Sequence, residues 1–463
     1  MTFDIEGEHN TATVHTNTPR EECEDEALEQ IQEMVNHEAF VGENDVEIMP
    51  DFHWGAGAVI GFTMPVKDRV VPNTIGVDIG CGMYAVKLNI PDFDREESTL
   101  SAIDTAIRNN VPTGFDVRSD SDYHVVNDFP YTTCEHKWDL FNEATDFDLD
   151  TDEPPKYPRD DYFTDLCRKV GYDIGRGINS IGSLGGGNHF IELGTDERGD
   201  VWCIIHSGSR GLGAAVAEYW QNQATARTTE RKTLDDVPES VRKYMENWKP
   251  KADKIRSEFE GEEIQKKFDE VSQAIQEYGP STSDRNTDLD YLEGEEAHGY
   301  IKDMIFAQTY ASESRKEMAY AVREALAAVF GRAQIVDSIE SVHNYIDFDD
   351  GMIRKGATSA HADERLVVPF NMSYGTIIVR GRGKESWNNS SAHGAGRAMS
   401  RSAAHDTFDE SDFETQTDGV YMSKTPMDEI PGAYKPAEQI EDVLGDSVRV
   451  ETRVKPFLSI KAE

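Results

Sequence analysis

The sequence lacks any long apolar stretch. It has 463 residues and contains no run of 18 or more apolar residues, which argues against a membrane span. The first nine residues, Met1–His9, are acidic and have no apolar core, so we expect no signal peptide there. The sequence also lacks internal repeats and any low-complexity linker long enough to separate autonomous domains. These absences favour one large domain without a membrane segment.

Cysteine is scarce as well. The five cysteines are odd in number and widely spaced, at Cys23, Cys81, Cys134, Cys167 and Cys203. Such a pattern favours a reducing cytoplasm over a framework of disulfides. We therefore expect a cytoplasmic protein.

Basic residues are few relative to acidic ones, with 46 against 88 and a formal net charge of −42. Taken alone, this charge argues against nucleic-acid binding, because phosphates would be repelled. The acids are spread over the whole chain, however, as expected of a protein kept soluble in concentrated salt. At about 1 M salt the Debye length is about 3 Å, so distant surface acids hardly affect a bound polyanion. We therefore predict a high-salt cytoplasm, in which local arginines decide binding.

The first part of the chain changes character twice. Residues 22–40 have apolar residues at helical spacing, which predicts an amphipathic helix. From Val46 to Ile90, glycines and β-branched residues predict short strands joined by glycine turns. Residues 116–160 are rich in Asp, Pro and Tyr, with the most acidic stretch at Asp146–Pro155. We predict a solvated acidic surface excursion there.

Strand-and-turn character returns in the middle of the chain, at residues 181–193 and 201–213. Highly charged segments with helical spacing follow, and they predict an exposed helical insertion at about 224–296. A further helix is predicted from Ala297 to Phe330, and the β-rich pattern resumes at Ile335. The candidate site residues come from all the glycine-rich β segments, so these segments are expected to converge in one core. The predicted fold class is α+β, a single mixed domain over residues 1–463.

Five residues offer ligands for a soft or borderline divalent metal. Asp78 and Cys81 are separated by Gly80, which permits a turn that brings both side chains to one point. A carboxylate and a thiolate together suit Mn, Fe, Co or Zn better than Ca or Mg. A buried cysteine beside a turn-forming aspartate is the alternative. The other three candidates lie in β segments, and each is also compatible with an ordinary core histidine: His189, His206 and His343.

A second group of candidate functional residues surrounds His393. Gly394, Gly396 and Arg397 follow this histidine within four residues. Glycines let backbone N–H groups approach a phosphate closely, and an arginine offers a bidentate fork for its oxygens. A histidine in such a loop can attack a phosphoryl group, although glycine-flanked histidines also occur in ordinary tight turns. Together with a metal site, the loop indicates nucleotidyl or phosphoryl transfer.

The remaining histidines are less informative. His53 is ambiguous, because lining the site and bracing a turn are both compatible with its surroundings. The others lie in mostly polar stretches and are predicted at the surface: His9, His15, His37, His124, His136, His298, His361 and His405.

Several long motifs, in the same order, resemble the RtcB family of RNA ligases. The resemblance runs from about residue 45 to the end of the chain. The segments that carry it are Pro50-Asp-Phe-His-Trp-Gly-Ala-Gly57, Gly76-Val-Asp-Ile-Gly-Cys-Gly-Met83, Leu184-Gly-Gly-Gly-Asn-His-Phe-Ile-Glu192, His206-Ser-Gly-Ser-Arg-Gly211, His343-Asn-Tyr345, Ser391–Arg401 and Ile430-Pro-Gly-Ala-Tyr-Lys435.

The resemblance implies a specific chemistry. Cys81 is expected to bridge two Mn²⁺ ions, one also held by Asp78 and His189, the other by His206 and His343. His393 is expected to attack the α-phosphate of GTP and form a histidine–GMP adduct. The guanylate then passes to an RNA 3′-phosphate, and a 5′-hydroxyl end expels GMP and seals the strand. A 2′,3′-cyclic phosphate end, as in tRNA splicing or RNA repair, is expected to be handled too.

The resemblance also implies the contacts with GTP. The family usually has a Pro-Gly-Ser-Met-Gly type of loop where this chain reads Pro369-Phe-Asn-Met-Ser373, so a nucleotide-binding loop is altered. The expected GTP-binding residues are Asn188, His189, Phe190, Ile191, Glu192, His343, Asn344, Pro369, Phe370, Asn371, Met372, Thr376, His393, Gly394, Ala395, Gly396 and Lys461.

RNA phosphates are expected at Arg210, Arg397 and Arg401, which flank the metal and nucleophile loops. Pairing of these arginines with nearby carboxylates is the alternative. The expected partner is RNA, either tRNA halves or broken strands, and the resemblance suggests archease as an activating partner. Two other functions stay open: a metal-dependent phosphoesterase that uses a metal-bound water, and a non-catalytic RNA-binding relative.

Overall fold

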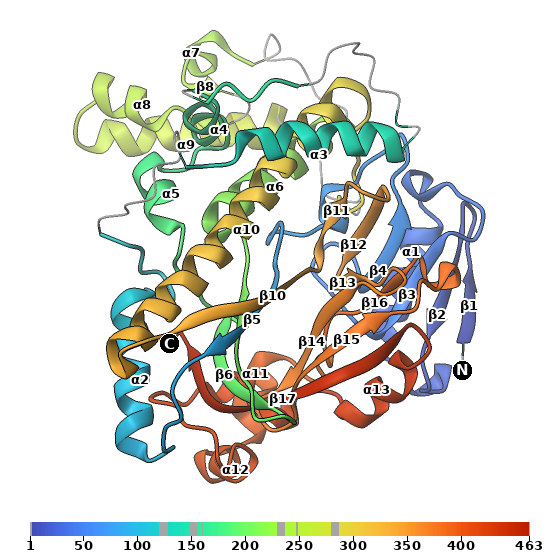
Figure 1. Ribbon diagram of the computed structural model, residues 1–463. Helices are drawn as coiled ribbons and strands as arrows, with labels where there is room; N and C mark the ends of the chain where they lie inside the picture. The colour runs from blue at the N-terminus through green and yellow to red at the C-terminus, as the bar shows by residue number, and fades with distance from the viewer. Residues whose placement is uncertain are drawn as a thin grey trace.

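Two β-sheets and one long helix organise the chain, as the computed structural model in Figure 1 shows. The structure describes residues 2–119, 128–145, 147, 155–159, 161–228, 237–246, 249–278 and 287–462. Helices and strands mix along the whole chain, which confirms the predicted α+β class. No described helix combines the length and the apolar character that a membrane crossing requires.

The first sheet has six strands in the order β1-β2-β3-β4-β12-β11. The pair β2 and β3 is parallel, and the other neighbours are antiparallel. Helix α1 (Asp25–Val35) buries Ile31 and Met34 against this sheet, in agreement with the helix predicted from residues 22–40. The strands are β1 (Thr2–Glu6), β2 (Thr11–His15), β3 (Val46–His53), β4 (Ile60–Pro65), β11 (Asn344–Asp347) and β12 (Met352–Lys355).

The second sheet has seven antiparallel strands in the order β10-β5-β7-β6-β17-β15-β14. Two short pairs, β13 with β16 and β8 with β9, complete the strands. The bounds are β5 (Gly82–Asn89), β6 (Phe190–Asp196), β7 (Val201–Ser207), β8 (Met245–Glu246), β9 (Lys249–Pro250), β10 (Gln334–Val342), β13 (Ala357–Ser359), β14 (Arg365–Asn371), β15 (Gly375–Gly381), β16 (Ser390–Ala392) and β17 (Val448–Lys461).

Helix α10 (Gly294–Phe330) runs across the molecule (Figure 1), and its buried residues share apolar clusters with residues of both sheets. Its C-terminal half packs with α2 (Glu97–Asn110) on one face of the seven-stranded sheet. It ends at Gly331, whose φ of +80° lies in the left-handed region that glycine adopts without strain. Further helices are α4 (Tyr162–Val170), α5 (Ile174–Ser180), α6 (Arg210–Thr228), α11 (Arg401–Thr407), α12 (Glu410–Gln416) and α13 (Ala437–Leu444).

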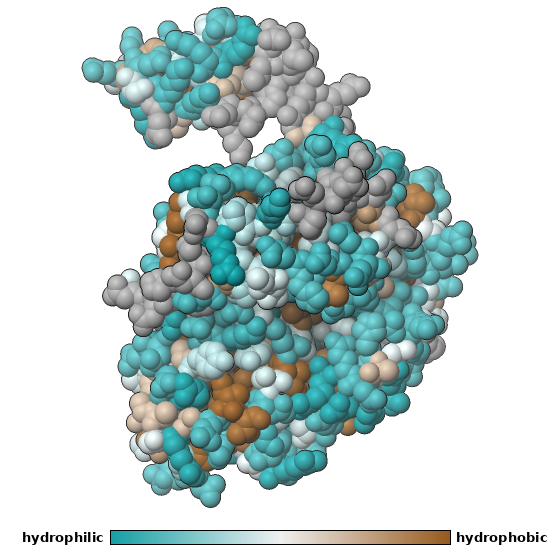
Figure 2. All heavy atoms as spheres, turned by 45° about the horizontal axis from the view of Figure 1, so that its top comes forward, coloured by the Kyte–Doolittle hydropathy of each residue, from teal (hydrophilic) through white to brown (hydrophobic). Residues whose placement is uncertain are grey.

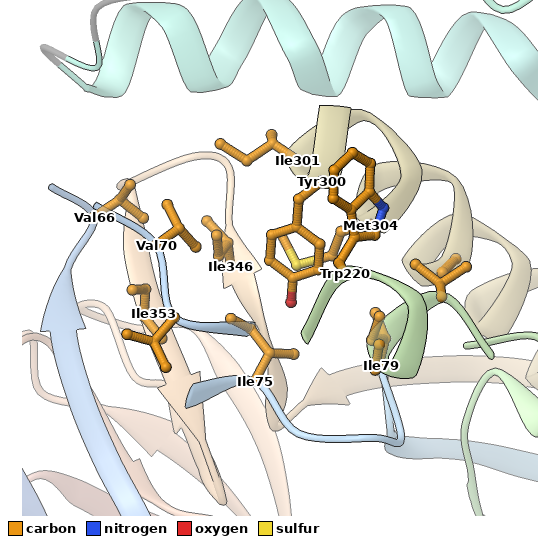
Figure 3. Close-up of a cluster of buried hydrophobic side chains, with 14 of the residues drawn as sticks. Val66, Val70, Ile75, Ile79, Trp220, Tyr300, Ile301, Met304, Ile346 and Ile353 are labelled. Carbon is orange, nitrogen blue, oxygen red and sulfur yellow. The ribbon is translucent and has the colours of Figure 1, made fainter. Parts of the chain in front are cut away.

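An apolar cluster lies directly behind the loop that carries Asp78 and Cys81. Figure 3 shows Trp220 of α6 and Tyr300 and Met304 of α10 next to Ile75 and Ile79 of that loop. Each of these side chains is at most 7% exposed. Burial of such a side chain stabilises a fold by about 1.5–3 kcal/mol, so this cluster fixes the position of the loop.

The acidic excursion predicted at 116–160 contains an amphipathic helix with one buried face. Helix α3 (Tyr131–Ala144) buries Tyr131, Cys134, Trp138 and Phe141, which recur at helical spacing and pack against α10. The prediction of a solvated surface segment is therefore wrong for these residues, because the surrounding acids hide an apolar stripe. Most of the acidic stretch 146–155 lies outside the described residues.

One predicted surface histidine is also buried. His15 is 3% exposed, its Nε2 lies 2.6 Å from Glu47 Oε2, and its ring stacks on Trp387. The polar sequence around it gave no sign of this, because both partners are distant along the chain. His124 lies outside the described residues.

The charged insertion forms a small helical lobe at the top of Figure 1. Helices α7 (Glu239–Arg242), α8 (Ala252–Glu258) and α9 (Glu262–Tyr278) enclose an apolar cluster of their own, including Val241, Tyr244, Ile255 and Val271. The visible side chains of the lobe are mostly hydrophilic in Figure 2. None of the described residues of the lobe lines the site described next.

Candidate metal centre and nucleotide pocket

The five predicted metal ligands lie where neighbouring strands of the seven-stranded sheet end. Asp78 and Cys81 precede β5, His189 precedes β6, His206 lies near the end of β7, and His343 follows β10. The order β10-β5-β7-β6 makes these strands neighbours, so their ends meet. In this register His206 pairs with both Met83 and Phe190, one or two residues from the other ligands.

Gly80 makes the turn between Asp78 and Cys81 possible. Its φ is +73°, and a Cβ added there would lie 3.0 Å from the backbone of Gln308. A larger residue would therefore push the ligand loop away from α10. The Gly80 N–H donates to the Asn344 carbonyl at 2.7 Å, which ties this loop to the segment that follows His343.

The five side chains form two sets that share one thiol. Cys81, His206 and His343 make one set, and Asp78, Cys81 and His189 make the other. In each set the candidate ligand atoms lie within 4.8 Å of one another. The shortest separations are 2.9 Å from His189 Nε2 to Asp78 Oδ2, 3.2 Å between the Nε2 atoms of His206 and His343, and 3.3 Å from Cys81 Sγ to His206 Nε2.

The electrostatics of this cluster suit a bound cation. Burial, and then the neighbouring imidazoles, hold the pKa values of His206 and His343 well below the usual range, so both rings are neutral. Burial and then the carboxylate of Asp78 raise the pKa of the Cys81 thiol. Burial acts against ionisation of Asp78 too, but His189 holds the pKa of that carboxyl below its ordinary value. A coordinating cation would favour the thiolate and use neutral imidazole nitrogens.

The donor set of sulfur, nitrogen and oxygen fits a borderline transition metal. The ring of His206 is oriented for metal binding, since its Nδ1 lies 3.0 Å from the Asn188 carbonyl and its Nε2 faces the cluster. A backbone carbonyl on the second ring nitrogen is the usual way in which a metal-binding histidine is oriented.

His393 stands next to the cluster. Its ring centroid lies 4.8 Å from that of His343, and its side chain is 21% exposed. The Nδ1 atom lies 2.7 Å from Oδ2 of the fully buried Asp51, although the two are not aligned as a hydrogen bond. The Gly394 N–H also donates to Asp51 Oδ2, at 3.3 Å. Asp51 therefore positions the His393 loop and leaves Nε2 for chemistry.

Most of the predicted GTP-binding residues line one pocket beside His393. Three of them do not: His189, Ile191 and Asn344. The Nε2 atom of His189 contacts Asp78 instead. Ile191 is fully buried in the apolar cluster under β6, because side chains alternate along a strand and Phe190 and Glu192 take the pocket side. Asn344 accepts the Gly356 N–H instead. The pocket is lined by Asn188, Phe190, Glu192, His343, Pro369, Phe370, Asn371, Met372, Thr376, His393, Gly394, Ala395, Gly396 and Lys461, with His53, His206, Gly375, Arg397, Arg401, Glu429 and Tyr434.

The altered loop at 369–373 keeps a tight turn without its glycine. The Asn371 side-chain oxygen accepts the N–H groups of Ser373 and Tyr374, at 3.0 and 2.9 Å. Asparagine stabilises such turns through this local hydrogen bond. Phe370 is 4% exposed and packs its ring on Tyr374, so the loop also gains an apolar anchor.

A buried carboxylate that the sequence did not single out organises the cations of the pocket. Glu429 is 2% exposed and accepts hydrogen bonds from Lys461 at 3.0 Å and from Arg397 at 3.2 Å. Arg401 reaches Asp428 at 3.1 Å and Glu429 at 3.5 Å. Two of the three predicted phosphate-binding arginines are therefore paired with carboxylates, the alternative stated above.

Arg210 points away from this pocket. Its guanidinium donates to the Ser183 hydroxyl at 3.1 Å and to the Gly114 carbonyl at 2.7 Å, and it does not line the pocket. It is the first residue of α6.

Lys355 joins two loops of the site from behind. Its Nζ donates to the Ala56 carbonyl in the loop after Asp51 and to the Asn73 carbonyl in the loop before Asp78, both at 2.8 Å. Burial lowers the pKa of this amine to about 7. Next to it, the Gly356 N–H donates to the His343 carbonyl at 2.7 Å. The end of β12 thus holds the metal and nucleophile segments together.

Known proteins match this chain along most of its length. The family model described as tRNA-splicing ligase RtcB matches residues 30–254 and 257–462. In two strains of Escherichia coli, RNA-splicing ligase RtcB1 is 30% identical and RNA-splicing ligase RtcB 29% identical, over 433 residues and 90% of each chain. The tRNA-splicing ligase RtcB of Methanococcus maripaludis is 27% identical over 459 residues, which cover 86% of this chain and 84% of the relative. Because the family model spans both ligand sets and His393, the chain belongs to the RtcB family.

Proposed function

We propose that this protein is an RNA ligase that joins a 3′-phosphate or 2′,3′-cyclic phosphate end to a 5′-hydroxyl end, with GTP and two Mn²⁺ ions. One observation carries the proposal: Cys81 Sγ belongs to two ligand sets, and the His393 ring lies 4.8 Å from a histidine of one of them. Family membership and the names of the relatives support RNA as the substrate.

The metals would be held as the two sets suggest. Asp78, His189 and Cys81 would bind one ion, and Cys81, His206 and His343 the other. Two such ions neutralise charge on phosphates and align attacking and leaving oxygens.

His393 would act as the nucleophile through Nε2. A bond forms between Nε2 and the α-phosphorus of GTP, while the bond to the oxygen of the leaving pyrophosphate breaks. The imidazole gains positive charge in this step, and the buried carboxylate of Asp51, 2.7 Å from Nδ1, stabilises that charge.

Two further steps complete the reaction of a 3′-phosphate end. A 2′,3′-cyclic phosphate end is first opened by water, which breaks the bond from phosphorus to the 2′-oxygen and leaves a 3′-phosphate and a 2′-hydroxyl. An oxygen of the RNA 3′-phosphate attacks the same phosphorus, the N–P bond breaks, and neutral His393 is restored. The 5′-hydroxyl oxygen of the second RNA end then attacks the 3′-terminal phosphorus, loses its proton to solvent, and expels GMP. The result is an ordinary phosphodiester linkage.

The pocket residues would select the nucleotide. Burial raises the pKa of Glu192 to about 7, and Lys461 acts against that rise. A carboxylate at this depth can accept two N–H groups from one edge of guanine, in line with the use of GTP. Lys461 and Arg397 both pair with Glu429 in the lining of the same pocket.

The cellular setting is part of the proposal. We expect a salt-rich cytoplasm, broken RNA or tRNA halves as substrates, and an activating partner such as archease.

Labelling with GTP carrying ³²P in the α-phosphate tests the nucleophile. With Mn²⁺, the protein should acquire label that survives denaturation, is lost in acid and is stable in alkali. The variant His393→Ala should acquire none, whereas His405→Ala, which replaces an exposed histidine on α11, should label normally. Label that persists in His393→Ala would contradict the assignment. A wild-type protein that takes up no label but releases phosphate from RNA ends would be a phosphoesterase.

A further inference from the structure

The cations around the site are already engaged with other groups. Arg397, Arg401 and Lys461 contact the carboxylates of Asp428 and Glu429. Two further cations donate to carbonyls: Arg210 to Gly114 and Lys435 to Phe52. An RNA strand would have to displace these partners to gain phosphate contacts. Something other than free positive charge is therefore needed to hold the RNA ends.

Trp54 offers such a contact. Its side chain is 52% exposed, although an indole ring is among the most favourable groups to bury. It lines a groove that also includes His53, Arg397 and Arg401. The same three residues line the nucleotide pocket, so the groove continues directly into the reaction site.

Phe115 occupies a comparable place beside the metal ligands. Its side chain is 91% exposed. The preceding Gly114 donates its N–H to the Gly185 carbonyl at 2.8 Å, so the Phe115 loop is attached to the glycine loop of His189. A Cβ added to Gly187 in that loop would lie 3.4 Å from the Arg401 guanidinium. The Phe115 loop, the glycine loop and Arg401 are therefore neighbours along one edge of the site.

The chemistry of the groove favours stacking over ionic contacts. Glu22, Glu24, Glu26 and Asp442 in its lining outnumber the basic residues Arg397, Arg401 and Lys435. Every base of a single strand has a flat face that an aromatic ring can cover, and stacking of a base on a ring requires no positive charge on the protein. An aromatic platform thus suits an RNA-joining enzyme with a net charge of −42.

We propose that Trp54 and Phe115 stack on unpaired nucleotides next to the two RNA ends and hold those ends at the reaction site. This inference rests on the proposed function, since it takes RNA as the substrate. Trp54 serves the strand in the groove, and Phe115 serves the strand that passes the glycine loop.

A binding assay with short single-stranded RNAs tests the proposal. Fluorescence anisotropy would follow eight-nucleotide RNAs with a 3′-phosphate or a 5′-hydroxyl, dye-labelled at the opposite end, without GTP. Trp54→Ala should weaken the binding of one RNA at least about fivefold, and Phe115→Ala that of the other, while Trp54→Phe retains stacking. Tyr320→Ala, which removes an aromatic side chain 53% exposed on α10, should bind both RNAs as the wild type does.

RNAs with one abasic position identify the contact itself. An abasic nucleotide at the stacked position should weaken binding to the wild type about as much as Trp54→Ala does, and it should add nothing in that variant. Equal affinities of Trp54→Ala, Phe115→Ala and wild type, or abasic effects that are the same in all of them, overturn the stacking proposal alone. A wild type that labels with GMP but binds neither RNA overturns both this inference and the proposed RNA substrate.

Discussion

The metal cluster and the arginine rim, by which we mean Arg397 and Arg401 at the edge of the nucleotide pocket, differ in how their charged groups are paired. In the cluster, the neutral imidazoles of His206 and His343, a buried thiol and a carboxylate direct their ligand atoms toward one another. At the rim, Arg397 and Arg401 already contact Asp428 and Glu429. The cluster has the arrangement of a site that requires a positive ion, and the rim is neutralised before any ligand arrives.

This difference assigns distinct tasks to the two regions. A bound cation would favour the thiolate and the carboxylate of this buried set, so metal binding would couple strongly to the stability of the cluster. Paired arginines contribute geometry more than net charge. The metals, not the arginines, would then supply most of the positive charge that phosphates meet.

The largest expected effect breaks the cluster. Cys81→Ser should lose both ions, with affinity lowered at least about 100-fold, because removal of even an outer partner of a metal ligand lowers affinity about 10–100-fold. His189→Ala should lose mainly one ion, since only Cys81 belongs to both sets. Elemental analysis measures this, with Cys203→Ser as the control for a buried cysteine elsewhere in the sheet. Equal losses from Cys81→Ser and His189→Ala would show that Cys81 is not shared.

A smaller effect is expected at the rim. Arg397→Ala removes a partner of the buried Glu429 and should weaken both GMP labelling and RNA joining by about tenfold or more, since such a loss costs about 1–3 kcal/mol. Arg401→Ala removes a side chain that is 46% exposed and should reduce joining by at most about fivefold, with labelling intact. Single-turnover assays of both steps separate these outcomes. Arg380→Ala, which breaks a surface pair with Glu451, is the control.

A third prediction concerns Lys355, the buried amine that connects two loops of the site. Its pKa is lowered to about 7 by burial, so above pH 7 the folded state lacks a proton that the unfolded lysine keeps. The free energy of unfolding should therefore rise between about pH 7 and 10, by up to about 1.4 kcal/mol per pH unit from this group. Urea unfolding at several pH values should show this slope in the wild type and a smaller slope in Lys355→Met. Identical slopes would mean that the amine is not buried as described.

The smallest effect is an expected lack of change. If metals and stacking hold the RNA, joining should persist or rise as salt increases, because the distant acids are screened. A ligation assay over a series of KCl concentrations measures this. A steep loss of joining with salt would indicate that unpaired arginines dominate binding, and the contrast between cluster and rim would fail.

Local signals made much of the site predictable. Gly80 between Asp78 and Cys81 indicated a turn, and the structure places both side chains in one ligand set. Alternation along Phe190–Glu192 was also visible in the sequence, and applying it would have excluded Ile191 from the pocket. The α+β class followed from glycine-rich strand segments interrupted by helical spacing.

The features that sequence reasoning missed depend on contacts between distant segments. Glu429 becomes important because it meets Lys461 and Arg397, each about 32 residues away. Asp51 lies within a quoted motif, but its contact with His393 bridges more than 300 residues. Helix α3 was hidden because acidic neighbours dominate the composition of its segment. No local pattern encodes such pairings, since the fold alone brings the partners together.

The joining reaction itself tests the central claim most directly. An RNA with ³²P in its 3′-terminal phosphate would be incubated with a 5′-hydroxyl RNA, GTP and Mn²⁺, and the products treated with phosphatase. The account predicts a longer strand in which the labelled phosphate resists phosphatase, formed by the wild type and by His405→Ala but not by His393→Ala. Release of the label as inorganic phosphate before the phosphatase is added, or joining that persists without GTP, would contradict it.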